Sequence, residues 1–378
     1  MKIRMLLSGT FFSSLLLAQT IGVNSSASVR IMVQPGHPLI EHRDGLQLLN
    51  FDFLLENTSR TPVHLNRIAV SLLDKNKKLI LLRAVDENGR PSGLSMISQG
   101  DIPSGGRIGL FNPFYEFGPE VKIGEMSYEF YFNDPDYKLG TPLDYQFSIR
   151  VTVTPVDFIE RTVLSLPLHD RIIVFDGHDF YSHHRRQNLA DPVFERANIH
   201  TNAVRYGYDF CAVNENADMY TDSPWKKENW YGYSKPIYAP ADGTVVSSAN
   251  DVQENDFQGR KVIYAHIPDN DVYKASYGNY VVIDHGHGEF SFLAHMKTGS
   301  VRVKPGDRVR VGQQLGELGF SGDAFAPHLH YMVIDGPDVL KAEGLPSYFQ
   351  NFRRVLGSTF ENVSQGQIDT GDIIEPEK

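Results

Sequence analysis

Apolar and polar residues alternate along most of the first half of the chain. One such run places Leu49, Phe51, Phe53 and Leu55 two residues apart, and another places apolar side chains at 145, 147, 149, 151 and 153. A period of two between turns rich in glycine, proline, asparagine and aspartate is typical of strands with one buried face. The pattern predicts an immunoglobulin-like β-sandwich over residues 28–168. Because its faces gather no titratable cluster, we expect an accessory module without chemistry of its own.

The second half also predicts β structure, because no long stretch repeats every 3.6 residues and glycine or proline punctuates most junctions. A polar stretch at 169–197 is predicted to be a linker, and 198–344 a second domain. The tail at 345–378 is expected to dock through aromatic residues and to end in a frayed acidic segment. The expected strands of the second domain are 243–248, 261–267, 279–284, 290–296, 308–318 and 328–334.

The first 27 residues have the pattern of a signal peptide. Lys2 and Arg4 precede an apolar run at 5–21, and Ser25 and Ala27 offer small residues for cleavage. An uncleaved anchor is the alternative, although the run is short and interrupted by Ser and Thr. No later stretch is apolar and long enough to span a bilayer. We expect export to the periplasm, the cell envelope or the extracellular space, with no stable membrane insertion once the signal is removed.

Charge and cysteine content narrow the classes of function. The formal net charge is −10 and no basic block stands out, which argues against nucleic acid as a partner. The single cysteine, Cys211, excludes an intrachain disulfide and a multi-cysteine zinc site. Histidine and carboxylate are the remaining candidate metal ligands. Eleven of the fourteen histidines lie from His169 onward, so we expect the chemistry in the second half.

Three features of that half suggest a metal site. His328 and His330 stand two residues apart at the start of a predicted strand, so their imidazoles project from the same face. Asp209 lies inside an aromatic run, where an ionised carboxylate needs a partner or a cation. His295 ends another apolar strand. Each feature is ambiguous alone, and a solvated histidine pair is the commoner explanation of a His-x-His tripeptide.

Taken in order, these segments resemble the lysostaphin-type (LytM-like) zinc endopeptidases of bacterial cell walls. The resemblance covers about 198–335 and implies that family's β-rich duplicated hybrid motif. The matching segments are YDF at 208–210, KPIYAPADG at 235–243, GNYVVIDHG at 278–286, LAHM at 293–296, VKPGD at 303–307, GQ at 312–313, SG at 321–322 and PHLH at 327–330.

The resemblance also implies one Zn²⁺ held by a His, an Asp and the second His of the His-x-His pair. Asp209 and His330 match two of these ligands, while His295 and His328 match the two catalytic histidines. The remaining ligand departs from the pattern. In the family a His stands four residues before the Asp, and this chain has Arg205 there, which cannot bind zinc. We expect His200, nine residues before Asp209, to take the place, with His184 or His183 in reserve.

The leading hypothesis is an exported zinc endopeptidase that hydrolyses amide bonds in peptidoglycan cross-links or stems. Zinc held by two imidazoles and one carboxylate keeps a coordination position for water, whose pKa falls to about 7. His295 and His328 would orient that water and move protons. Because Arg205 occupies a ligand position, the alternative is a metal-free protein that binds cell wall or activates a hydrolase. A lipoyl-like carrier domain, suggested by residues 309–316, is disfavoured because an exposed Met-Lys type hairpin is missing from the sequence.

Overall fold

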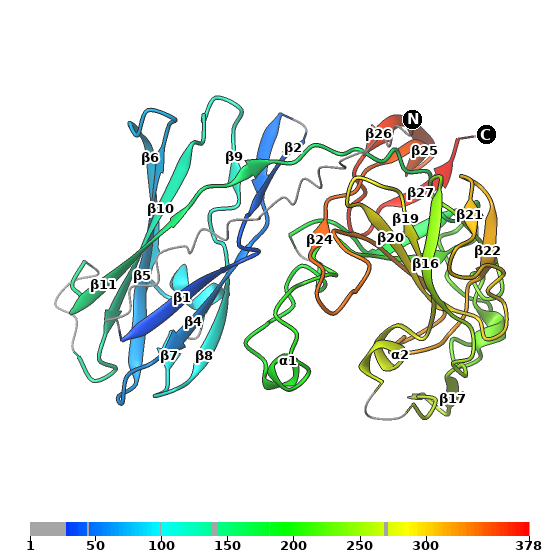
Figure 1. Ribbon diagram of the computed structural model, residues 1–378, viewed down its shortest axis with the longest axis horizontal. Helices are drawn as coiled ribbons and strands as arrows, with labels where there is room; N and C mark the ends of the chain where they lie inside the picture. The colour runs from blue at the N-terminus through cyan, green and yellow to red at the C-terminus, as the bar shows by residue number, and fades with distance from the viewer. Residues whose placement is uncertain are drawn as a thin grey trace, which may run out of the picture.

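The chain folds into two lobes, seen in a computed structural model that describes residues 28–43, 45–98, 100–137, 143–180, 182–267 and 271–377. The predicted signal peptide at 1–27 lies outside the described residues. Figure 1 shows an N-terminal lobe of strands β1–β12 in blue and cyan, beside a C-terminal lobe of β13–β27 in green to red. Within the described ranges, no helix has the length and apolar character needed to cross a membrane.

The N-terminal lobe is a β-sandwich. The ring of Phe53 on β4 lies 4.8 Å from Tyr128 and 5.0 Å from Phe130 on β10, so the sheets that carry β4 and β10 pack face to face. A short 3-10 helix, η1 (Leu94–Met96), also belongs to this lobe. Its three sheets, in pairing order, are β1 (Val29–Gln34), β4 (Asp52–Asn57) and β8 (Arg107–Phe111); β11 (Phe147–Val153), β10 (Glu125–Asn133), β5 (Val63–Leu73) and β6 (Leu79–Asp86), with β7 (Asp101–Ile102) on β5; and β12 (Val156–Asp157), β2 (Leu39–Arg43), β3 (Leu46–Leu49) and β9 (Glu116–Phe117).

The core of this lobe ends earlier than the predicted boundary at 168. Its buried apolar residues run from Val29 to Val153, whereas Leu164, Leu166 and Leu168 belong to the core of the C-terminal lobe. These leucines stand two residues apart and bury one face of an extended segment, which bridges to Phe349. Residues 164–168 therefore pack with the second lobe and not with the sandwich.

The C-terminal lobe is built on one large sheet. A second pair of strands, β15 (Pro236–Tyr238) and β22 (Gln314–Glu317), packs beside it, and β17 (Asp256–Gln258) pairs with β18 (Lys261–Ile263). The short helices are α1 (Pro192–Arg196), α2 (Val272–Tyr277) and η2 (Lys227–Asn229). In pairing order the large sheet contains β21 (Arg308–Val309), β16 (Gly243–Ala249), β19 (Asn279–Asp284), β20 (Phe290–Met296), β23 (Leu329–Ile334), β14 (Tyr208–Ala212), β13 (Ile172–Asp176), β27 (Ile373–Pro376), β25 (Phe349–Leu356) and β26 (Thr359–Gly366), with β24 (Gly344–Leu345) on β23.

The all-β prediction is confirmed, and several strands follow the apolar pattern closely. β19 and β20 have the bounds predicted for them, because each apolar run ends at a glycine-rich turn or a charged residue. The run at 308–318 instead divides into β21 and β22. Gly312 adopts a φ of +76° between them, a left-handed conformation that glycine tolerates and that turns the chain.

The segment after residue 345 is part of the large sheet, so the prediction of a frayed acidic end was wrong. Phe349 and Phe352 of β25 are fully buried, and β27 pairs with both β13 and β25. The acidic side chains that suggested fraying are neutralised: Asp372 lies 3.0 Å from Arg354, and Glu375 lies 3.2 Å from Arg171. Strand pairing and ion pairs thus hold this segment in place.

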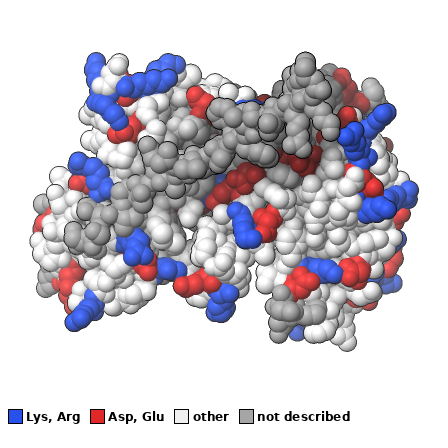
Figure 2. Space-filling model, in the orientation of Figure 1, with Lys and Arg blue, Asp and Glu red and all other residues white. Residues whose placement is uncertain are grey.

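Charged side chains of both signs are mixed among the described residues that are visible in Figure 2. Lysine, arginine and acidic residues are interspersed over both lobes there. This distribution agrees with the modest net charge of −10 and gives the described residues in that view no track for a phosphate backbone.

Candidate active site

Adjacent central strands of the large sheet bring Asp209, His328 and His330 together. Asp209 on β14 pairs with His330 on β23, and Nδ1 of His330 lies 3.0 Å from Oδ1 of Asp209. Nε2 of His328 lies 3.3 Å from the same oxygen. All three residues are at most 3% exposed. The predicted i, i+2 spacing therefore brings both imidazoles to one buried carboxylate.

His295 reaches the same place from β20, the strand on the other side of β23. Its ring centroid lies 4.7 Å from that of His328 and 5.8 Å from that of His330. The backbone of His295 has a φ of +60°, which is uncommon for any residue other than glycine. A regular strand would point His295 away from the face of its neighbour Ala294, which pairs with His330. The left-handed backbone instead turns the imidazole toward the cluster, and such strain is often found at functional sites.

The second imidazole of the candidate metal site belongs to His184, from the stretch predicted to be a linker. Its Nε2 lies 3.8 Å from Oδ2 of Asp209, and its ring centroid lies 4.7 Å from that of His330. One possible ligand atom each from His184, Asp209 and His330 lies within 4.8 Å of the other two, and all three side chains are buried. The linker therefore includes strand β13 and a loop that contributes to the site.

His200, the ligand expected from the sequence, is not brought to this cluster. Its side chain is exposed, and its Nε2 lies 3.1 Å from Oδ1 of Asn198 just after α1. The groups of possible metal ligands found among the described residues include His184 and His183 but not His200. His200 therefore lies outside this cluster, and His184, one of the two residues held in reserve, lies within it.

Asp176 at the end of β13 organises the loop that carries His184. Its carboxylate accepts hydrogen bonds from Ser182 Oγ at 2.7 Å and from the backbone N–H groups of His183 and His184 at 3.1 and 3.3 Å. Nδ1 of His184 also lies 2.7 Å from Oδ2 of Asp176. A carboxylate beside the second nitrogen of an imidazole fixes the direction of the ring. Asp176 was missed from the sequence, although a carboxylate that ends the apolar run at 172–175 was a signal for it.

Arg205 has a structural role. Its side chain is 1% exposed, and Nη1 lies 2.6 Å from Oδ2 of Asp52 in the N-terminal lobe. Nη2 donates to the carbonyl oxygen of Gln34 at 3.3 Å and lies 3.7 Å from Glu343. The ion pair between the lobes thus explains why arginine stands where the family has histidine. The imidazole beside Asp209 is supplied by His184 instead.

Burial and charge set the protonation states in the cluster. Burial, with the charges of His328 and His330, lowers the pKa of His295 well below its usual range. Burial also lowers the pKa of His330, to about 4. It would raise the pKa of Asp209, but His184 and His328 outweigh it and hold that pKa well below its usual range. Asp209 is therefore ionised and His330 neutral at pH 7, the forms in which these side chains bind a metal.

Two backbone carbonyls fix the tautomers of the histidines outside the candidate metal group. Nδ1 of His295 lies 2.8 Å from the carbonyl oxygen of Ser321, and Nδ1 of His328 lies 2.8 Å from that of Ala326. A carbonyl oxygen only accepts, so Nδ1 donates in both rings. Nε2 is therefore the atom of each ring that can take up or release a proton.

The donor set suits a zinc ion. Two imidazoles and one carboxylate are the ligands of several catalytic zinc sites, in which the fourth position holds water. Nε2 of His330 is buried without a hydrogen-bond partner, although buried polar atoms are usually paired. His295 and His328, which lie beside the group, also carry proton-exchanging atoms. The described residues thus bring together side chains of the types that could hold a metal ion and exchange protons beside it.

Comparisons with known proteins agree with this arrangement. Residues 231–342 match peptidase family M23, a range that includes His295, His328 and His330. The chain is 33% identical over 99 residues to the peptidoglycan DD-endopeptidase ShyA of Vibrio cholerae serotype O1, covering 26% of this chain and 17% of the relative. It is 42% identical over 67 residues to ShyC of the same organism, covering 17% and 15%. The chain therefore matches less than a fifth of either relative.

A solved structure described as a zinc containing peptidase from Vibrio cholerae is also similar. It is 13% identical, and the superposition covers 79% of this chain and 80% of the other with a TM-score of 0.26. A TM-score this low does not establish a shared arrangement of the whole chain.

Proposed function

We propose, from the match of residues 231–342 to peptidase family M23, that the protein is a zinc-dependent endopeptidase of peptidoglycan. It hydrolyses amide bonds in the peptide cross-links or stems of the cell wall. The name DD-endopeptidase of both Vibrio relatives supports cross-links as the substrate.

The buried group of His184, Asp209 and His330 is the observation that carries this proposal. The three side chains come from a loop and from two paired strands, and their ligand atoms converge to within 4.8 Å. An ionised carboxylate with two imidazoles in a buried site requires a compensating cation or proton. We propose that these residues hold one Zn²⁺. When bound, zinc supplies a Lewis acid and lowers the pKa of a coordinated water to about 7.

His295 and His328 are proposed as the catalytic acid–base pair. Each ring donates from Nδ1 to a backbone carbonyl, and Nε2 exchanges the proton. One neutral imidazole would take the proton of the attacking water at Nε2 and return it to the leaving amine as the amide breaks, while the other, when protonated at Nε2, would donate to the carbonyl oxygen. Fixing both tautomers in advance keeps Nε2 in position throughout the reaction.

The substrate would approach from the side of Phe325. Its ring stacks on that of His328 with centroids 5.0 Å apart, and its side chain is 39% exposed. Phe175 lies 4.8 Å from Phe325 and is 44% exposed. Two surface phenylalanines next to a buried acid–base residue offer an apolar contact to an extended peptide. Export to the cell envelope would bring the enzyme to this substrate.

The metal-free alternative loses its motivation. It depended on Arg205 at a ligand position, whereas the structure gives Arg205 an ion pair with Asp52 and brings His184 to the cluster. Metal content still decides between the two functions, because a binding module needs no zinc.

The test combines metal analysis with cleavage of purified peptidoglycan. We expect about one zinc per chain, release of peptide fragments detected by mass spectrometry, loss of release after exhaustive chelation, and its return on addition of zinc. The His200→Ala variant is the matched control and should remain active. Activity that survives verified removal of all metal would contradict the proposal, and folded protein that takes up no zinc would favour the binding module.

A further inference from the structure

The loop at residues 177–180 and 182–190 carries His184 and lies between the two lobes. It will be called the His184 loop. The other two members of the candidate metal group, Asp209 and His330, lie on paired strands in the middle of the large sheet. Only His184 depends on a segment without regular secondary structure. Its position therefore depends on whatever holds the loop.

Within the loop, His178 is held by the N-terminal lobe. Its Nε2 lies 2.8 Å from Oε2 of Glu41 on β2, and both side chains are 2% exposed. Nδ1 of His178 lies 3.1 Å from the hydroxyl of Tyr208, the neighbour of Asp209 on β14. Because one imidazole contacts both lobes in a buried place, the start of the loop cannot move without breaking polar contacts.

Aromatic and cationic side chains hold the middle of the loop. The ring of Tyr115 from the N-terminal lobe stacks on Phe180 with centroids 4.5 Å apart and an angle of 18°. The guanidinium of Arg185 lies 5.2 Å from the centre of the Tyr115 ring and 4.7 Å from that of Phe180. Arg185 is 7% exposed and directly follows His184. The sandwich thus contacts the residue next to the candidate ligand.

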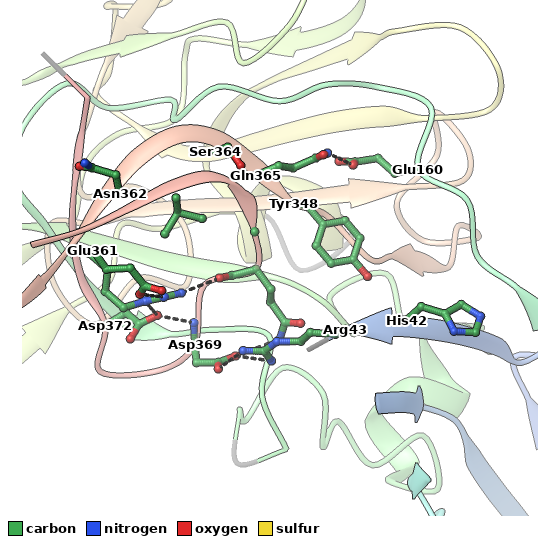
Figure 3. Close-up of a pocket in the computed structure, with 14 residues that line it drawn as sticks. His42, Arg43, Glu160, Tyr348, Glu361, Asn362, Ser364, Gln365, Asp369 and Asp372 are labelled. Carbon is green, nitrogen blue, oxygen red and sulfur yellow. Dashed lines mark hydrogen bonds and ion pairs between the residues drawn. The ribbon is translucent and has the colours of Figure 1, made fainter. Parts of the chain in front are cut away.

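A turn at 368–372 forms hydrogen bonds with the His184 loop, and the N-terminal lobe contacts this turn as well. The backbone N–H of Gly177 donates to Oγ1 of Thr370 at 2.9 Å, and the N–H of Thr370 donates to Asp179 at 2.7 Å. Arg43 of β2 makes two contacts with the carboxylate of Asp369, at 3.1 and 2.5 Å. Figure 3 shows this pair at the edge of a cavity of about 900 Å³ between β2 and the β25–β26 hairpin.

From these contacts we propose that the N-terminal lobe is a positioning part of the metal site, with Tyr115 and Glu41 as positioning residues. They hold the His184 loop in the conformation in which His184 faces Asp209 and His330. This inference rests on the proposed zinc function. The sandwich then contributes to the affinity for zinc, in addition to any role in targeting. Tyr115 and Glu41 act through the loop and do not touch the metal or the substrate.

The test is the zinc affinity of the full-length chain, measured by competition with a fluorescent chelator. Tyr115→Ala removes the stacking surface, and Glu41→Gln keeps the shape but removes the charge beside His178. Outer residues that orient ligands typically change metal affinity 10- to 100-fold. Since these residues act through the loop, we expect about tenfold weaker binding in both variants. Tyr115→Phe keeps the ring and should bind zinc as the wild type does.

Tyr131→Ala is the matched control. Tyr131 is also a half-buried tyrosine of the sandwich, with Tyr145 4.7 Å away and Arg67 5.3 Å from its ring centre. It lies on β10, which makes no sheet contact with the loop, so this variant should keep wild-type affinity. Equal zinc affinity in Tyr115→Ala, Glu41→Gln and the wild type would overturn the inference alone. An equal loss in Tyr131→Ala would also overturn it, because the effect would then be general destabilisation. A wild-type protein that takes up no zinc would overturn the proposed function as well.

Discussion

Replacement of His184 by alanine tests the assignment of the third ligand most directly. His184 is buried, its Nε2 lies 3.8 Å from Asp209, and its Nδ1 lies 2.7 Å from Asp176. His184→Ala therefore removes one of three proposed ligands and leaves the other two on their strands. His200→Ala is the matched control, since it removes an exposed imidazole of the same chemistry nearby in the sequence.

The size of the effect follows from the number of ligands. Structural zinc sites with four ligands have apparent binding free energies of about 10–16 kcal/mol, or roughly 3 kcal/mol per ligand. Because about 1.4 kcal/mol corresponds to a factor of ten, loss of one ligand should weaken binding on the order of 100-fold. The metal-free variant should still fold, since Asp209 and His330 lie on paired strands and the hydrogen bond from Ser182 to Asp176 remains.

Competition with a chelator of known affinity measures the difference, and circular dichroism checks that each variant folds. His184→Ala should lose zinc at chelator concentrations that leave the wild type and His200→Ala loaded. If His200→Ala lost the metal while His184→Ala kept it, the loop geometry described above would be refuted.

Three further predictions concern single side chains. His328→Ala should keep its zinc, because Asp209 and the proposed ligands remain, but lose at least about 100-fold in turnover of peptidoglycan, since an acid–base group is gone; full activity would contradict the assignment. His295→Gly should be more stable than His295→Ala by about 1 kcal/mol in urea unfolding, because alanine at a φ of +60° is strained and glycine is not; equal midpoints would argue against strain. Burial raises the pKa of Glu160 from its ordinary 4.5 to about 7, so the folded state holds the proton more tightly than the unfolded state. The protonated Glu160 stabilises the folded state fully below about pH 4.5, and this stabilisation is lost as the pH rises through 7. Glutamine cannot ionise, so the free energy of unfolding of Glu160→Gln should rise by about 1 kcal/mol relative to that of the wild type between pH 4 and pH 8, after allowance for partial exposure. A difference that does not change with pH in urea unfolding would count against this pKa.

The regular part of the fold could be predicted because it is encoded locally. The runs at 279–284 and 290–296 are apolar, short and bounded by turns, and β19 and β20 follow them. His328 and His330 could be placed together for the same reason, because two residues two apart on an extended chain share a face.

The predictions that differ from the structure concern residues whose contacts are distant in sequence. His200 is closer than His184 to Asp209 along the chain, but distance along a chain does not tell which loop folds back to a strand. The stretch at 169–197 looked like a linker because it is polar, yet the polarity of Asp176 and Ser182 is used in internal hydrogen bonds. Similarly, Glu375 suggested fraying, but its partner Arg171 lies about 200 residues earlier, and β27 pairs with β13, which is equally distant in sequence.

The place of β27 in the sheet has a consequence for how the protein matures. β27 lies between β13 and β25, so the large sheet cannot close before residues 373–376 have been synthesised. The sandwich draws its core from residues 29–153 and has no such requirement. During synthesis the first lobe can fold early, while the second lobe completes its large sheet only after residue 376 has been made, through slow, long-range pairing. In the proposed hydrolase, the lobe with the candidate active site would therefore be the later of the two to fold.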